Sequence, residues 1–204
     1  MTYRDAEFAY AEPKINDLCN VVRGGSPRPA GDPKYFGGNI PWITVGELTK
    51  DDRIYLDSVS TGLTESGREH SRFLEKGTVV LANSGATLGV PKILNLSGCI
   101  NDGVAAFLSL SIEVIPEFLY YILYSWVGLL RDINQGLGQP NLNTEIIGNL
   151  RIVLPPIDEQ KQIVSIISNV YSKIQKEEEY KTLLRNLKKG LMQKLLTGQI
   201  RVKV

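Results

Sequence analysis

The distribution of proline limits this chain more than any other feature of its sequence. All ten prolines lie at or before Pro156, and 17 of the 19 glycines precede Leu150. Proline interrupts helices and central strands, whereas the residues after Pro156 contain only Gly190 and Gly198 as weak breakers. The sequence therefore predicts an α/β (α+β) globular domain over residues 1–156, followed by one long helix within residues 157–204.

The first part alternates short apolar runs with turns rich in glycine and proline, which is typical of short strands. Strands are expected at 40–45, 78–82, 91–96, 100–108 and 150–154. A short amphipathic segment is expected at 14–22 and a buried helix at 116–133, where Pro116 suits a first helical turn. Three polar loops are expected at 23–33, 83–89 and 135–143.

The second part is expected to be helical from Asp158 to Leu196. Apolar residues fall at 163, 167, 170 and 174, and then at 180, 184, 187, 191 and 195, with a phase slip across 176–180. This spacing is typical of a coiled coil, and a helix of that length measures roughly 60 Å. Its expected dimerisation seam consists of Ile163, Ile167, Val170, Ile174, Leu184, Leu187 and Leu191. The alternative is a helical hairpin that folds back at Lys176–Tyr180.

The net charge of +1 conceals an asymmetry between the two parts. Residues 1–150 contain 12 Lys and Arg against 17 Asp and Glu, a net charge of −5, and residues 151–204 contain 11 against 5, a net charge of +6. A basic tail suits nucleic acid or an acidic protein partner. The alternative is a solvated helix face whose cations favour the end of the helix dipole.

Motifs for chemistry are missing from the sequence. No phosphate-binding glycine loop or dinucleotide fingerprint is present, and His70 is the only histidine. We therefore expect a non-enzymatic protein with no cofactor and no metal. Cys19 and Cys99 are expected to be reduced core thiols. We expect a cytoplasmic protein without a membrane span, because the N-terminus lacks an apolar signal region and no long apolar run occurs.

The order of several short motifs resembles the specificity subunit of Type I restriction–modification enzymes. The motifs are Ile40-Pro-Trp-Ile-Thr-Val45, Gln139-Pro-Asn-Leu-Asn143, Leu154-Pro-Pro-Ile-Asp-Glu-Gln160 and Lys194-Leu-Leu-Thr-Gly198. The resemblance implies a target-recognition domain that reads half of a split DNA site and a long helix that acts as a spacer in an antiparallel coiled coil. It also implies partners: modification subunits that methylate adenine with S-adenosylmethionine, and ATP-dependent restriction subunits.

This chain has one expected recognition domain and one long helix, whereas the family pattern has two of each. We therefore expect a homodimer, joined through the C-terminal helix, that reads an interrupted palindrome. The alternative is that the chain is a fragment of a longer gene. A second class of function also stays open: a non-DNA-binding interaction protein with a globular head and a dimerising helical stalk, which the acidic front part favours slightly.

DNA contacts are expected from the three polar loops, since loops on a rigid scaffold suit base readout. The candidate residues are Arg23, Ser26, Arg28 and Lys34 from the first loop, Asn83, Ser84, Thr87 and Lys92 from the second, and Gln135 and Gln139 from the third. An arginine can bridge two acceptors of guanine, and an asparagine can pair with adenine. The alternative for Asn83 and Ser84 is that they hydrogen-bond their own turn.

Overall fold

A computed structural model describes residues 10–136 and 142–202 of the chain. Its internal contacts divide the chain into two compact units, Met1–Lys161 and Gln162–Val204. The first is a mixed α/β unit, and the second continues a long helix, so the expected fold class is confirmed. Within the described ranges, no helix has the length and apolar character that a membrane crossing requires.

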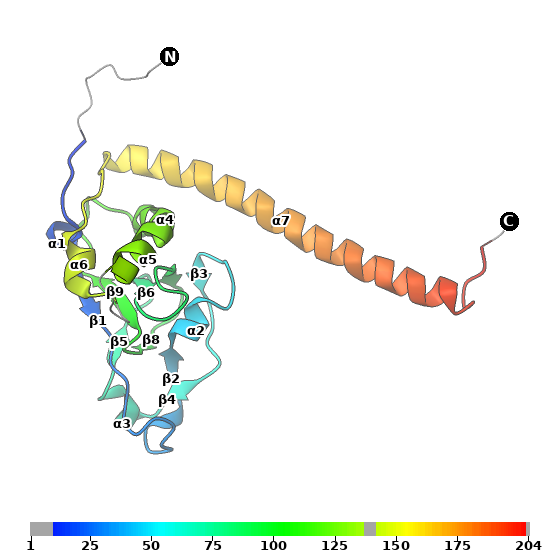
Figure 1. The fold of residues 1–204 in the computed structure, drawn as a ribbon, viewed down its shortest axis with the longest axis horizontal. Coiled ribbons are helices and arrows are strands. Elements are labelled where there is room, and N and C mark those ends of the chain that lie inside the picture. Colours follow the sequence, from blue (N-terminus) through cyan, green and yellow to red (C-terminus); the bar gives the residue numbers. More distant parts are fainter. Residues whose placement is uncertain (1–9, 137–141, 203–204) are drawn as a thin grey trace, which may run out of the picture. The chain divides into compact units, whose positions relative to one another are not determined.

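Two sheets build the globular unit (Figure 1). The five-stranded sheet has the order β1 (Asn20–Arg23), β9 (Val104–Leu108), β6 (Val79–Ala82), β7 (Pro91–Leu94) and β3 (Tyr55–Leu56). The four-stranded sheet has the order β4 (Gly62–Leu63), β2 (Phe36–Ile43), β8 (Gly98–Ile100) and β5 (Arg72–Leu74). Neighbouring strands are antiparallel except for the pairs β3–β7 and β2–β8, which are parallel.

The core lies between these sheets because their strands place apolar side chains on facing sides. Ile43 and Ile100 from the smaller sheet join Val80 and Val104 from the larger one in a single buried cluster. Side chains alternate along a strand, so Trp42, the neighbour of Ile43, lies in a second cluster on the other face of β2. Trp42 is thus a core residue, 7% exposed.

The described part of this unit also contains six short helices. They are α1 (Ile15–Leu18), α2 (Val45–Leu48), α3 (Glu65–Arg68), α4 (Pro116–Ser125), α5 (Val127–Gly136) and α6 (Thr144–Asn149). The single helix expected over 116–133 is divided at Trp126. The Ser125 hydroxyl donates to the carbonyl oxygen of Ile122 at 2.7 Å, and this type of side-chain bond competes with the helical ladder.

The amphipathic segment 14–22 contains α1 and then enters β1. Two further expectations about local structure were wrong. The run 100–108 contains two strands separated by the turn 101–103. The run 150–154 is no strand, because only two isolated bridges join it to the N-terminal segment, at Ala11–Leu154 and Lys14–Arg151. Pro13 interrupts that pairing, since proline has no N–H to donate.

The long helix α7 spans Ile157–Leu196, 40 residues, and runs without a break through 176–180 (Figure 1). The hairpin alternative was therefore wrong. The helix begins one residue before Asp158, which lies in its first turn. Gln160 is fully buried and fixes this first turn: its Nε2 donates to the carbonyl oxygens of Glu113 at 2.7 Å and Pro155 at 2.8 Å. The motif Pro155–Gln160 thus holds the first turn of α7 in place through the hydrogen bonds of Gln160.

Candidate nucleic-acid interface

The first polar loop is held against the turn between β8 and β9. The backbone N–H of Gly24 donates to the carbonyl oxygen of Val104 at 3.0 Å, and that of Gly25 donates to Ile100 at 3.2 Å. A Cβ atom at Gly24 would overlap the carbonyl oxygen of Asn101, so this close approach requires glycine. The start of the loop therefore has one fixed position on the sheet.

Asp102 in that turn organises the side chains of the loop. The Ser26 hydroxyl donates to Asp102 Oδ1 at 2.7 Å and accepts from the Asp102 N–H at 3.2 Å, while Arg23 Nε donates to the Asp102 carbonyl oxygen. Arg28 Nη2 lies 3.6 Å from Asp102 Oδ2, and the Arg28 side chain is 73% exposed. Ser26 therefore positions the loop, whereas Arg28 presents its guanidinium to solvent.

Further cations surround the same loop. Arg72 Nε donates to the Arg23 carbonyl oxygen at 3.0 Å, and Lys34 Nζ lies 5.2 Å from the centre of the Tyr35 ring. Arg68 belongs to α3, which lies beside this loop at one end of the globular unit (Figure 1). Arg68 and Arg72 were absent from the candidate set, because only the fold brings their strand and helix to the loop.

This end of the globular unit is more basic than the rest of it. Five cations meet there: Arg23, Arg28, Lys34, Arg68 and Arg72. The acidic residues of the same segments are Asp32, Glu65, Glu69 and Asp102. Residues 1–150 as a whole have 12 cations against 17 acidic residues. These residues have a net charge of +1, against −6 for the remaining residues of 1–150, so this end is the part of the globular unit that repels a phosphate backbone least.

The second polar loop reaches the same turn from the other side. Ser84 lies beside the turn, since a Cβ atom at Gly103 would come within 2.6 Å of the Ser84 hydroxyl oxygen. Thr87, further along the loop, is half-buried. Asn83 is only 1% exposed, its N–H donates to Gly103 at 2.9 Å, and its carbonyl accepts from Leu142 at 2.8 Å. Its burial therefore speaks against Asn83 as a base contact, and the bonds that fix the turn come from its backbone.

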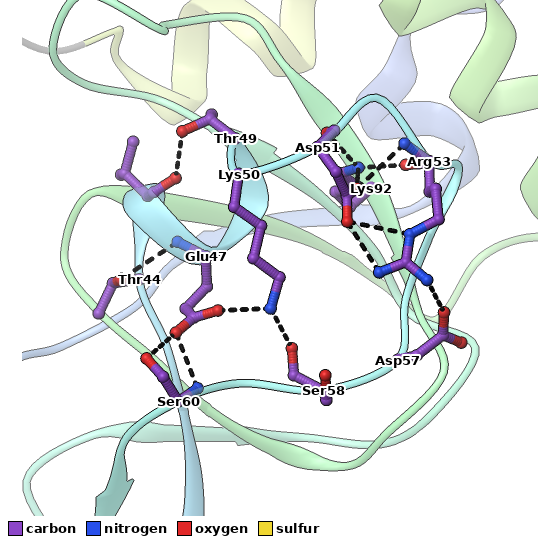
Figure 2. A network of polar contacts seen from close by, with 11 residues as sticks. Thr44, Glu47, Thr49, Lys50, Asp51, Arg53, Asp57, Ser58, Ser60 and Lys92 are labelled. Carbon is purple, nitrogen blue, oxygen red and sulfur yellow. Dashed lines mark hydrogen bonds and ion pairs between the residues drawn. The ribbon is translucent and has the colours of Figure 1, made fainter. Parts of the chain in front are cut away.

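Lys92 is likewise removed from the candidate set. It is 2% exposed, because β7 is an inner strand that is covered on both faces. Its Nζ donates to the carbonyl oxygen of Asp51 at 2.8 Å, to Asp51 Oδ1 at 2.9 Å and to the carbonyl oxygen of Arg53 (Figure 2). Because the Lys92 ammonium has three acceptors and is almost fully buried, it stabilises the domain and does not reach a DNA backbone.

The partners of Lys92 form one half of a polar network. Burial alone would raise the pKa of Asp51, but hydrogen bonds from Lys92 and Arg53 outweigh it and hold that pKa well below its ordinary value. Arg53 also pairs with Asp57 at 3.2 Å (Figure 2). In the sequence, Asp51 stands between Lys50 and Asp52-Arg53, a pattern typical of an ordinary solvated turn. The structure corrects this, because the carboxylate compensates a buried charge.

Glu47 forms the other half of the network. Its carboxylate accepts from Lys50 Nζ at 2.8 Å and from the Ser60 N–H at 2.8 Å, while Lys50 also donates to the Ser58 carbonyl oxygen at 2.7 Å (Figure 2). Burial would raise the pKa of Glu47, but its hydrogen bonds from Lys50 and Ser60 lower it overall. Both halves together fix the segment 47–60.

The third polar loop is described only in part. Gln139 lies outside the described residues, and Gln135 lies in the last turn of α5, where its side chain is not described. Asn143 is the N-cap of α6, and its Oδ1 accepts from the Glu145 N–H at 3.0 Å. Within residues 10–136 and 142–202, no group of three His, Cys, Asp or Glu side chains could hold a metal ion.

Comparisons with known proteins agree with this fold. The family model described as the Type I restriction modification DNA specificity domain matches residues 9–185. The MjaIX specificity subunit of a Type I restriction enzyme from Methanocaldococcus jannaschii is 29% identical over 178 residues, which are 85% of this chain and 40% of that protein. The MjaVIII specificity subunit from the same organism is 28% identical over 174 residues, 81% of this chain and 38% of that protein.

Solved structures share the fold of this chain and, like the relatives above, are longer than it. A chain from a structure described as showing assembly and conformational transition of the type I R-M system has a TM-score of 0.71 at 19% identity. It covers 94% of this chain and 47% of its own length. The HsdS subunit from Thermoanaerobacter tengcongensis has a TM-score of 0.68 at 18% identity, covering 94% of this chain and 46% of that subunit. The chain therefore spans less than half the length of each of these proteins.

Proposed function

Because the chain belongs to the family of Type I restriction modification DNA specificity domains, we propose that it recognises a specific DNA sequence, one half of a bipartite site. The observation that carries the proposal is the basic loop. Arg28 is exposed and only loosely paired with Asp102, while Ser26 and Gly24 hold the backbone beneath it. A fixed loop with an exposed arginine suits bidentate contact with guanine.

We further propose that the chain has no catalytic activity and acts in the cytoplasm, where its DNA lies. Residues 1–156 form the target-recognition domain, and residues 157–204 form the spacer and dimerisation region. Modification subunits, and the ATP-dependent restriction subunit, dock on the assembly and supply methylation and cleavage. The names of the related proteins, which are specificity subunits of Type I restriction enzymes, support this assignment.

The proposed working unit is a homodimer through α7. The apolar stripe of this helix supports it, because Ile167, Val170, Ile174, Leu184, Leu187 and Leu191 are all exposed in the single chain. Two copies paired antiparallel would cover these side chains and place two identical recognition domains on one DNA. An interrupted palindrome is the DNA sequence that fits such two-fold symmetry.

Replacing Arg28 by Ala is the test of DNA readout. The variant should bind its specific site more weakly by roughly 1–3 kcal/mol, because a bidentate guanine contact is lost. Fluorescence anisotropy measures this difference, with scrambled DNA and with the DNA motif that is methylated in cells that express this chain and a modification subunit. Lys76→Ala is the matched control, since Lys76 lies at the opposite end of β5 from Arg72, next to Ser97.

The same titrations, repeated at several salt concentrations, decide between two classes of function. A DNA-reading domain releases counterions on binding, so its affinity falls steeply with salt. Equal affinity of Arg28→Ala and Lys76→Ala for the specific site would remove Arg28 from the interface. A flat salt dependence with no sequence preference would instead indicate an interaction protein with a globular head and a helical stalk.

A further inference from the structure

A groove of about 830 Å³ lies where the N-terminal segment meets the first turn of α7. Leu18, Ile112 and Leu154 line it, together with the acidic residues Asp17, Glu113 and Glu159. Neither Lys nor Arg occurs among its described lining residues. Ile112 is 95% exposed, an unusual position for a large aliphatic side chain. The groove is thus apolar with an acidic border.

The segment after α7 has the complementary pattern. Gly198 adopts φ +73° and ends the helix, and the N–H of Ile200 then donates to the carbonyl oxygen of Lys194 at 3.1 Å. Ile200 and Val202 are both exposed and flank Arg201. From Arg185 onward the chain contains six cations and no acidic residue. This C-terminal segment, residues 198–202, is thus apolar and basic.

We propose that the C-terminal segment of one copy occupies the groove of a second copy in the antiparallel dimer. This inference rests on the homodimer proposed above and adds a docking site to it. The groove and the C-terminal segment match in charge and in apolar character. The groove borders the first turn of α7, and the C-terminal segment follows its last turn. In an antiparallel pair, the end of one helix lies beside the start of the other, which brings the segment of one copy to the groove of the second.

The apolar stripe itself gives the register of the pairing. In an antiparallel pair, residues at equal distances from the two-fold axis face each other. Three pairs share one centre, Glu179: Ile163 with Leu195, Ile167 with Leu191, and Ile174 with Leu184. The same centre places Ile200 opposite Asp158, in the first turn of α7 beside the groove.

The middle of the helix agrees with this register. Continuing the spacing of four and three residues from Ile174 leads to Glu177 and Lys181, which interrupt the apolar stripe. With the two-fold axis at Glu179, Glu177 of each copy faces Lys181 of the other, which gives two equivalent pairs of opposite charge. Opposite charges inside a seam are a known way to fix register. The two charged positions at the centre therefore face each other, whereas Val170 falls opposite Lys188, the neighbour of Leu187.

Cross-linking in the full-length chain tests the docking directly. Cysteines are introduced by Ile112→Cys and Val202→Cys, and a short bis-maleimide is added; Cys19 and Cys99 are buried and free. The proposal expects a product of twice the 22.6 kDa chain on a denaturing gel. Lys76→Cys with Val202→Cys is the control and should give no such product. A cross-link within one chain, or equal products from both pairs, would overturn the docking.

Sedimentation separates failure of the docking from failure of the dimer. Ile200→Asp should raise the dimer dissociation constant about a hundredfold, because two apolar contacts are lost per dimer. Asn186→Asp adds the same charge to α7, outside both the C-terminal segment and the apolar stripe, and should change the constant little. A dimeric wild type with equal constants for both variants would overturn the docking alone. A monomeric wild type would overturn the dimer and the docking together.

Discussion

Replacing Leu184 by Asp is expected to convert the dimer into a monomer. Leu184 lies in the apolar stripe of α7 and is 45% exposed in the single chain, and in the proposed homodimer a second helix covers it. Each copy would lose about 2 kcal/mol of apolar burial. Loss in both copies raises the dissociation constant roughly a thousandfold, before any cost of burying the new carboxylate. Sedimentation velocity at micromolar protein measures the change.

Asn186→Asp is the matched control for this variant. Asn186 is two residues away, on the opposite side of the helix from Leu184, and it is exposed. The substitution adds the same charge to the same turn, so helix propensity changes similarly while the stripe is untouched. The dimer should persist in this variant. If Leu184→Asp and Asn186→Asp both sediment as the wild type does, α7 is not the dimer interface.

Replacing Asp51 by Ala is expected to destabilise the globular unit by about 3 kcal/mol, because breaking a buried pair leaves one charge uncompensated. That charge is Lys92, which would keep only the backbone carbonyls of residues 51 and 53. The expected loss is at the lower end of the usual range, since the Asp51 side chain itself is 30% exposed. Urea unfolding at pH 7 measures it, with Glu69→Ala, an exposed carboxylate, as the control.

The loss of stability in Asp51→Ala is also expected to depend on pH. Its pKa in the folded chain lies below the ordinary value of 3.8. A carboxyl with a lowered pKa contributes its full stabilisation above the unfolded pKa and loses it as the pH falls toward the folded pKa. The difference between wild type and Asp51→Ala should therefore be constant from pH 7 to pH 5 and shrink below pH 4. A difference that is already absent at pH 7 would contradict this assignment.

Much of the fold follows from local sequence patterns. The apolar runs at 78–82 and 91–96 correspond to β6 and β7, and the segment without helix breakers after Pro156 forms α7. Lys92 shows where such patterns fail. Its sequence neighbours suggest a strand, but a strand pattern does not tell whether the second face is open or covered. Asp51, the partner that makes burial tolerable, is 41 residues away.

The candidate DNA interface was only partly predictable for the same reason. Arg23 and Arg28 stand out in the sequence because they border a loop of glycine and proline. Asp102, which orders that loop, is separated from Ser26 by 76 residues and has no sequence motif of its own. Arg72 reaches the loop because β5 pairs with β8, and Arg68 belongs to α3, which directly precedes β5 in the chain. Contacts across such distances depend on the sheet order, which short motifs do not specify.

The adenine methylome of cells that express this chain with a modification subunit tests the central claim most directly. Two identical recognition domains related by a two-fold axis should direct methylation to one palindromic motif, interrupted by a spacer of fixed length. The Arg28→Ala variant should reduce or redirect that methylation. Methylation of an asymmetric motif would contradict the homodimer, and the absence of any motif that depends on this chain would contradict its role in DNA recognition.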